Sequence, residues 1–226
     1  MAIELVVFDC DGVLVDSEHL ANRVLAELLT ELGLPTTTEE SIATYMGLSM
    51  ASAVDRIEAS LGRGVPPDFL DRYRTATFAA FERELTAVDG IVEVIEALRW
   101  PSCVATSGDP DRVRRTLMLT GLHHHFDGRI FSAVEVERGK PFPDLFLHAA
   151  ATVGAAPERC VVVEDSPFGV RAAVAAGMRP LGYAAMTPAG VLAECGAETF
   201  SSMAELPALL DALDASADDE GSDRSP

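Results

Sequence analysis

The sequence predicts an α/β protein in which a parallel sheet and its covering helices are interrupted by an all-helical insert. From Asp89 onward, short apolar runs alternate with helical patterns, which is typical of parallel strands joined by helices. Between the first apolar run and Asp89, the chain has helical patterns and no strand pattern over about 70 residues. We therefore expect one helical domain inserted directly after the first strand.

The first strand is an uninterrupted apolar run over residues 3–8, rich in β-branched side chains, as expected for a strand buried on both faces. Asp16 and Ser17 can cap the helix that follows. Within the insert, apolar residues recur at helical spacing, and glycines and prolines separate the helices. The expected helices span residues 18–32, 38–44, 49–61 and 68–85. The insert is thus predicted to cover residues 17–86.

The alternating pattern of the rest of the chain predicts the core domain, residues 1–16 and 87–215. The expected strands span residues 102–106, 129–133, 160–163, 179–183 and 199–200. The expected helices span residues 91–99 and 203–213 and begin also at Pro110, Pro143 and Pro167. Residues 216–226 are acidic and almost free of apolar side chains, so we expect a disordered tail.

Composition restricts the possible partners and compartments. A net charge of −19 on 226 residues disfavours a nucleic-acid partner and is compatible with a monomer. No apolar run is long enough to cross a membrane, and the first residues lack the pattern of a signal peptide. The four cysteines have no metal-type spacing, which favours reduced thiols. We therefore expect a cytoplasmic protein without membrane or nucleic-acid partners.

Polar side chains follow three separate strands of the expected sheet at the points where those strands end. Because the carboxyl ends of parallel strands meet at one edge of a sheet, these groups can converge in space. They are Asp9, Asp11, Thr106, Ser107, Glu164 and Asp165. Four carboxylates together require a hard cation, and oxygen ligands suit Mg²⁺, which also accepts a phosphate oxygen of a substrate.

Two further features indicate an anion at the same edge. Thr106, Ser107 and the amides after them lie at a helix N-terminus, where an anion is favoured. Lys140 is the single lysine in a chain with 16 arginines, which suggests a position that needs a compact ammonium. A cation, an anion site and a neighbouring carboxylate together predict phosphoryl transfer.

Four stretches of the chain resemble, in order, the four motifs of haloacid dehalogenase-superfamily phosphatases. They are residues 8–18, Thr106 with Ser107, residues 139–144, and residues 163–166 with Gly169. The resemblance covers nearly the whole chain, and the helical insert after the first motif resembles the β-phosphoglucomutase-like branch. It implies a Rossmann-like parallel sheet with an inserted helical cap, and an enzyme whose partner is a small phosphorylated molecule.

The resemblance also implies roles for individual residues. Asp9 is the nucleophile that forms an aspartyl-phosphate. Asp11 protonates the leaving oxygen and then activates the hydrolytic water. The phosphate-binding residues implied are Thr106, Ser107, Gly108 and Lys140. Mg²⁺ is implied at the Asp9 carboxylate, the Asp11 main-chain carbonyl and Asp165, with Glu164 beside the ion or linked to it through water.

Single positions discriminate between related chemistries. Dehalogenases lack the second acid and the metal site, and phosphonate-cleaving relatives have a small residue where this chain has Asp11. Sugar-phosphate mutases are the main alternative, but they have a histidine where this chain has Ala21 and an arginine after a Gly-Val-Ser turn, where it has Met50. A mutase must hold its intermediate dry, whereas a phosphatase only needs water to enter, so both departures favour a phosphatase.

The substrate follows less directly from the sequence. A helical cap selects small molecules, and residues 81–85 ahead of Asp89 and Gly90 resemble bacterial phosphatases that act on 6-phosphogluconate and similar sugar phosphates. A non-catalytic module that only binds a phosphorylated metabolite is a second alternative. It would be expected to have lost Asp9 or Asp11, and both are present.

Overall fold

The computed structural model describes residues 2–46, 48 and 50–219 and contains two compact units. One unit is Asp16–Thr86, and the other is formed by the chain up to Val15 and from Ala87 on. Within the described residues, no helix is long and apolar enough to cross a membrane. Gly47 and Ser49, which belong to an expected turn and helix start, lie outside the described residues.

The larger unit is built on a six-stranded, fully parallel sheet in the order β3-β2-β1-β4-β5-β6. The strands are β1 (Leu5–Phe8), β2 (Ser102–Thr106), β3 (Ile130–Ser132), β4 (Cys160–Glu164), β5 (Arg179–Tyr183) and β6 (Glu198–Phe200). Every residue of β1, β2 and β4 is buried, as expected for central parallel strands covered on both faces. The predicted α/β class with a Rossmann-like parallel sheet is therefore confirmed.

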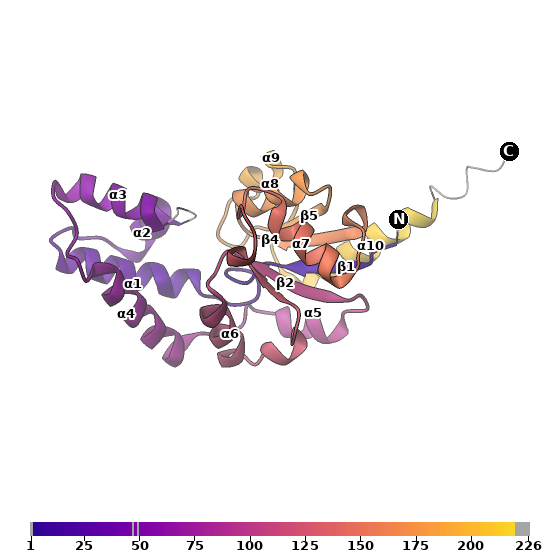
Figure 1. Cartoon of the computed structure of the whole chain (residues 1–226), viewed down its shortest axis with the longest axis horizontal. Helices are drawn as coiled ribbons and strands as arrows, with labels where there is room; N and C mark the ends of the chain where they lie inside the picture. The colour runs from indigo at the N-terminus through magenta and orange to yellow at the C-terminus, as the bar shows by residue number, and fades with distance from the viewer. Residues whose placement is uncertain (1, 47, 49, 220–226) are drawn as a thin grey trace. The chain divides into compact units, whose positions relative to one another are not determined.

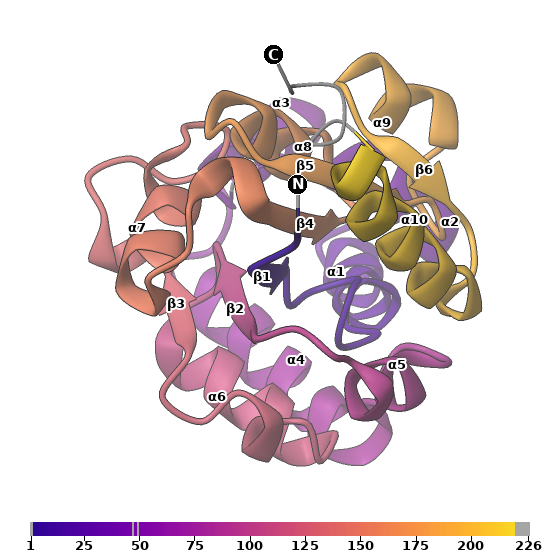
Figure 2. The ribbon, with the colours of Figure 1, turned by 90° about the vertical axis from the view of Figure 1, so that its right-hand side faces the viewer.

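Helices cover both faces of this sheet (Figure 2). They are α5 (Ile91–Ala97), α6 (Pro110–Leu119), α7 (Asp144–Val153), α8 (Pro167–Ala175), α9 (Ala189–Glu194) and α10 (Leu206–Asp219). Apolar residues of α7 and α8 pack on the face to which Leu5 and Val7 point, while α5, α6 and α10 lie on the opposite face. Short 3₁₀ turns occur at His123–His125, Ala133–Glu135, Pro157–Arg159 and Met203–Glu205.

The smaller unit consists of four helices with an apolar core of their own. They are α1 (Glu18–Glu31), α2 (Thr38–Tyr45), α3 (Met50–Leu61) and α4 (Phe69–Glu84), and α1 packs against both α2 and α4 (Figure 1). Leu29, Ile57 and Phe69 are almost completely buried within it. One buried polar link, from the Ser41 hydroxyl to the Asn22 side chain at 2.9 Å, joins α2 to α1.

The structure differs from the sequence-based expectation in a few local features. The helix α9 was not expected, because half of its six residues are alanine or glycine and they form no clear apolar stripe. The Ser17 side chain makes no capping hydrogen bond, because its backbone is already helical. The helix α10 continues to Asp219, four residues into the segment for which disorder was expected. Residues 220–226 of that predicted tail lie outside the described residues.

Candidate active site

The candidate site lies at the carboxyl edge of the sheet, where the strand order reverses between β1 and β4. Parallel α/β sheets bind their ligands at such a switch point, because the connections diverge there to opposite sides of the sheet. Asp9 follows β1 directly, Thr106 ends the neighbouring β2, and Glu164 ends β4 on the other side of β1. The register pairs Phe8 with both Val104 and Val163, so the three strands end side by side.

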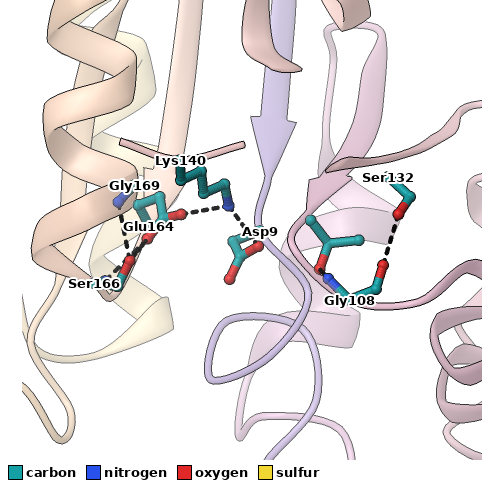
Figure 3. Close-up of polar contacts among 8 residues, drawn as sticks. Asp9, Gly108, Ser132, Lys140, Glu164, Ser166 and Gly169 are labelled. Carbon is teal, nitrogen blue, oxygen red and sulfur yellow. Dashed lines mark hydrogen bonds and ion pairs between the residues drawn. The ribbon is translucent and has the colours of Figure 1, made fainter. Parts of the chain in front are cut away.

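Lys140, from the segment between β3 and α7, joins two of these strand ends (Figure 3). Its ammonium donates to Asp9 Oδ1 at 2.7 Å and to Glu164 Oε1 at 2.6 Å, and its side chain is only 5% exposed. Burial by itself disfavours the ammonium, but the two carboxylates outweigh it, so the pKa of Lys140 lies above its ordinary value. Lys140 is therefore a permanent buried cation beside Asp9.

The Glu164 carboxylate is completely buried, and both of its oxygens are engaged. While Oε1 accepts from Lys140, Oε2 accepts from the Ser166 backbone amide at 2.9 Å and from the Ser166 hydroxyl at 2.8 Å. The same hydroxyl accepts from the Gly169 amide at 3.0 Å and so caps α8. Glu164 thus links Lys140 to the cap of this helix and holds the ammonium in position.

Three carboxylates at this edge are close enough to hold one metal ion. One oxygen each of Asp9, Glu164 and Asp165 lies within 4.8 Å of the other two. The Asp165 carboxylate reaches this place because residue 12 is a glycine with φ +75°, and a Cβ there would overlap it. This all-oxygen donor set fits a hard divalent cation such as Mg²⁺.

The electrostatics around Asp9 also fit a cation. Burial raises the pKa of the Asp9 carboxyl to about 7, against the lowering effect of Lys140, and the neighbouring Glu164 adds to the rise. Lys140 alone therefore does not offset the burial of this acid. A divalent cation at the three carboxylates would favour the ionised form that a nucleophile needs.

On the other side of β1, Thr106 and Gly108 form a compact loop that leads into α6. The Gly108 amide donates to Thr106 Oγ1 at 3.0 Å, and the buried Ser132 hydroxyl, at the end of β3, donates to the Gly108 carbonyl at 2.7 Å (Figure 3). The Asp109 carboxylate accepts from the Asp111 and Arg112 amides and caps α6. Ser107, by contrast, is exposed, between the two residues whose contacts shape this loop.

Asp11 lies in the turn after β1, and its carboxylate forms an ion pair with Arg112 of α6. The turn is fixed by its backbone, since the Gly12 amide donates to the Val15 carbonyl at 2.9 Å. The structure thus brings Asp9, Lys140, Glu164 and Asp165 into one cluster and pairs Asp11 with a residue of the helix that follows Thr106.

Comparisons with known proteins identify the family to which this fold belongs. The family model of haloacid dehalogenase-like hydrolases matches residues 6–183. This chain belongs to the haloacid dehalogenase-like hydrolases. It is 29% identical over 208 residues to 6-phosphogluconate phosphatase of Escherichia coli (strain K12), covering 92% of this chain and 94% of that protein.

Two further proteins extend the comparison. Fructose-1-phosphate phosphatase YqaB of the same strain is 32% identical over 174 residues, which cover 76% of this chain and 92% of that protein. A family hydrolase from Deinococcus radiodurans R1, solved with bound phosphate and sodium, has a TM-score of 0.81 and 35% identity, covering 92% and 95% of the two chains. The chain is accordingly a haloacid dehalogenase-like enzyme, a hydrolase of phosphoric monoesters.

Sequence reasoning missed two residues that shape this haloacid dehalogenase-like site. Ser132 ends β3, but the expected strand ran on to residue 133, so the sequence did not mark this serine as a strand end. Arg112 is one of several arginines on α6, and nothing in the spacing distinguishes it from Arg114 or Arg115. Only the fold shows that it is the one that meets Asp11.

Proposed function

We propose that this enzyme is a Mg²⁺-dependent phosphatase that hydrolyses a small sugar phosphate, such as 6-phosphogluconate, through an aspartyl-phosphate on Asp9. The observation that carries the proposal is the convergence of the Asp9 carboxylate with a buried ammonium and two further acids at a strand end. A carboxylate flanked in this way can attack phosphorus only when a second cation reduces the repulsion between two anions.

The proposed metal ligands are the carboxylates of Asp9 and Asp165 and the main-chain carbonyl of Asp11. Glu164 differs from them, because both of its oxygens already accept hydrogen bonds from protein groups. We therefore place Glu164 beside the ion, or linked to it through a water molecule, rather than among the direct ligands. When bound, Mg²⁺ supplies positive charge against the phosphoryl oxygens and orients them for in-line attack.

In the proposed mechanism, Asp9 and Asp11 share the covalent and proton-transfer work. An Asp9 oxygen forms a bond to phosphorus while the bond from phosphorus to the leaving oxygen breaks, and Asp11 gives that oxygen a proton. Asp11, now a carboxylate, takes a proton from water as the water oxygen attacks phosphorus and the bond to Asp9 breaks. Inorganic phosphate is released, and both aspartates return to their starting states.

The remaining predicted residues bind the phosphoryl group in this proposal. Lys140 holds the Asp9 carboxylate by one oxygen and offsets the charge that builds up beside it. The Thr106 hydroxyl and the Ser107 amide bind phosphoryl oxygens at the start of α6, where the helix dipole favours an anion, and the Gly108 amide, which donates to Thr106 Oγ1, holds the loop in shape. The haloacid dehalogenase-like hydrolase from Deinococcus radiodurans R1 with bound phosphate supports an anion site on this fold.

The proposed substrate class rests on the names of two relatives, and the choice of hydrolysis rests on two positions at which this chain differs from mutases. Relatives named for 6-phosphogluconate and fructose 1-phosphate both act on small sugar phosphates. Ala21 and Met50 stand where mutases have a histidine and an arginine, which favours hydrolysis over transfer to a second sugar hydroxyl. The substrate is therefore assigned to the sugar phosphates as a class, with 6-phosphogluconate as its first candidate.

The proposal is tested by measuring phosphate release from a panel of sugar phosphates and from p-nitrophenyl phosphate. Each compound is assayed with Mg²⁺ and with a chelator, for the wild type and for Asp9→Asn. Release that needs Mg²⁺ and is lost in Asp9→Asn supports the phosphatase and ranks its substrates. Conversion between sugar-phosphate isomers without phosphate release would replace it with a mutase. Binding of these compounds without either reaction would replace it with a non-catalytic module.

A further inference from the structure

We infer that Arg112 is a positioning residue for Asp11: its guanidinium holds one carboxyl oxygen, Oδ1, and so fixes the direction of the other oxygen, which exchanges a proton with the leaving oxygen. The inference rests on the proposed function, because it needs Asp11 to act as the general acid. It adds a residue outside the four motifs of the sequence and gives it a defined step, the protonation of the leaving group.

The first support is the degree of burial of the ion pair between Arg112 and Asp11. The Asp11 side chain is 18% exposed and the Arg112 side chain 31% exposed. By contrast, Arg99 and Asp211, which form a similar pair at the surface, are 63% and 61% exposed. Ion pairs between exposed side chains contribute little to stability. The reduced access of water at Asp11 strengthens the attraction between its carboxyl group and Arg112, and so restricts the direction of that group more firmly.

The second support is that Arg112 is itself anchored to the phosphate-binding loop. It lies in the first turn of α6, and its backbone amide donates to the Asp109 carboxylate at 3.3 Å. A Cβ on Gly108 would come within 3.5 Å of Arg112 Nη1 and within 3.4 Å of Thr106 Oγ1. The guanidinium therefore lies between Asp11 and the loop that is proposed to bind the phosphoryl group.

The third support is that the backbone at Asp11 leaves only its side chain to be oriented. The turn from Asp11 to Val15 is closed by a β-bridge and by the hydrogen bond from the Gly12 amide to the Val15 carbonyl. A guanidinium presents its donors in a rigid plane and so restricts the direction of a carboxylate that it meets. Proton transfer depends on that direction, because donor and acceptor must come within hydrogen-bond reach.

The experiment compares two leaving groups, because only one of them needs a proton from Asp11. The alkoxide leaving group of a sugar phosphate must be protonated as its bond to phosphorus breaks, whereas p-nitrophenolate is stable enough to leave unprotonated. The value of kcat/KM is used because it includes the first phosphoryl transfer and not the later hydrolysis of the aspartyl-phosphate. The variants are Arg112→Gln, Arg112→Lys and Asp11→Asn, with Arg114→Gln as a matched exposed control on the same helix.

We expect Arg112→Gln to lower kcat/KM about tenfold or more for the best sugar phosphate and less than about threefold for p-nitrophenyl phosphate. The loss lies in the first phosphoryl transfer rather than in substrate binding, because the substrate contacts remain. Arg112→Lys recovers part of it, since it restores the positive charge without the planar donor set. Arg114→Gln leaves kcat/KM unchanged for both substrates. All variants unfold cooperatively on heating, which shows that they are folded.

A double variant shows whether Arg112 acts through Asp11. In the Asp11→Asn background, adding Arg112→Gln should change kcat/KM for the sugar phosphate less than about twofold, because the group to be oriented is already lost. Equal losses for both substrates, or losses that multiply in the double variant, would each overturn the inference. If Asp11→Asn itself lowers kcat/KM no more for the sugar phosphate than for p-nitrophenyl phosphate, the proposed function fails instead.

Discussion

The Glu164 carboxylate lies against the backbone of Gly169 and fills the space that a Cβ on residue 169 would occupy. This close approach lets Ser166 cap α8 and bind Glu164 Oε2 at the same time, and so fixes the other oxygen, Oε1, toward Lys140. The glycine thus belongs to the site although it carries no side chain.

We predict that Gly169→Ala removes most of the activity. The new methyl group forces the buried Glu164 carboxylate to move, at a cost of about 1–3 kcal/mol in the free energy of unfolding. Because Lys140 bonds to both Glu164 and Asp9, a shift of Glu164 displaces the ammonium and the nucleophile, and we expect kcat/KM to fall about 100-fold. Gly190→Ala in α9 is the matched control, since a Cβ there meets nothing within 4 Å, and it should raise stability by about 0.4–1 kcal/mol. Equal activity in both variants would contradict the prediction.

The bridge made by Lys140 leads to a second prediction, for Lys140→Met and Lys140→Arg. Removing the ammonium leaves Glu164 buried without its cation, and we expect Lys140→Met to lower the free energy of unfolding by about 3–5 kcal/mol. The bulkier guanidinium of Lys140→Arg cannot take the place of an ammonium between Asp9 Oδ1 and Glu164 Oε1 without moving one of them. Chemical denaturation should show the stability loss of Lys140→Met. Measurements of kcat should find both variants nearly inactive.

A compensating variant separates stability from activity at this bridge. Lys140→Met with Glu164→Gln removes one buried charge of each sign, so most of the lost stability should return. Activity should stay low, because Asp9 still lacks its neighbouring cation. If the double variant regained activity with its stability, Lys140 would be a structural residue only.

The carboxyl edge of the sheet was predictable because strand ends are readable from local patterns. Apolar runs that end in Asp9, Thr106 or Glu164 mark both a strand and the polar group that follows it, and β2 and β5 have the predicted bounds. Parallel pairing then places the strand ends together, whatever their separation in the sequence. The convergence of Asp9 with Glu164 follows from these two facts, whereas Lys140 reaches them from the segment between β3 and α7.

The pairing of Asp11 with Arg112 was not predictable, because it depends on how α6 is rotated around its axis. The sequence shows that Arg112, Arg114 and Arg115 share this helix, but not which of them meets the turn after β1. In the same way, the Ser132 hydroxyl could have faced either side of β3 until the register was known.

Ser132 supplies a third prediction, for Ser132→Ala. Its hydroxyl donates to the Gly108 carbonyl and so holds the proposed phosphate-binding loop from outside. We expect a loss of about 0.5–1.5 kcal/mol in the free energy of unfolding and a severalfold weaker inhibition by inorganic phosphate. Thr152→Ala removes the same kind of bond, from a hydroxyl to the His148 carbonyl in α7, and should leave phosphate inhibition unchanged. Unchanged inhibition in both variants would exclude this role.

The thiols of the folded protein differ sharply in their predicted reactivity. Burial raises the pKa of Cys103 to about 12 and that of Cys160 to about 11, and burial raises the pKa of Cys10 well above its usual value. Because the thiolate is the reacting species, a raised pKa means slow reaction at pH 8. Cys195 is only partly buried, so a disulfide reagent should react rapidly with one thiol of the native protein and with four after unfolding. Cys195→Ser should abolish the rapid phase alone; a second rapid thiol would show that one of the three buried cysteines is accessible in the folded protein.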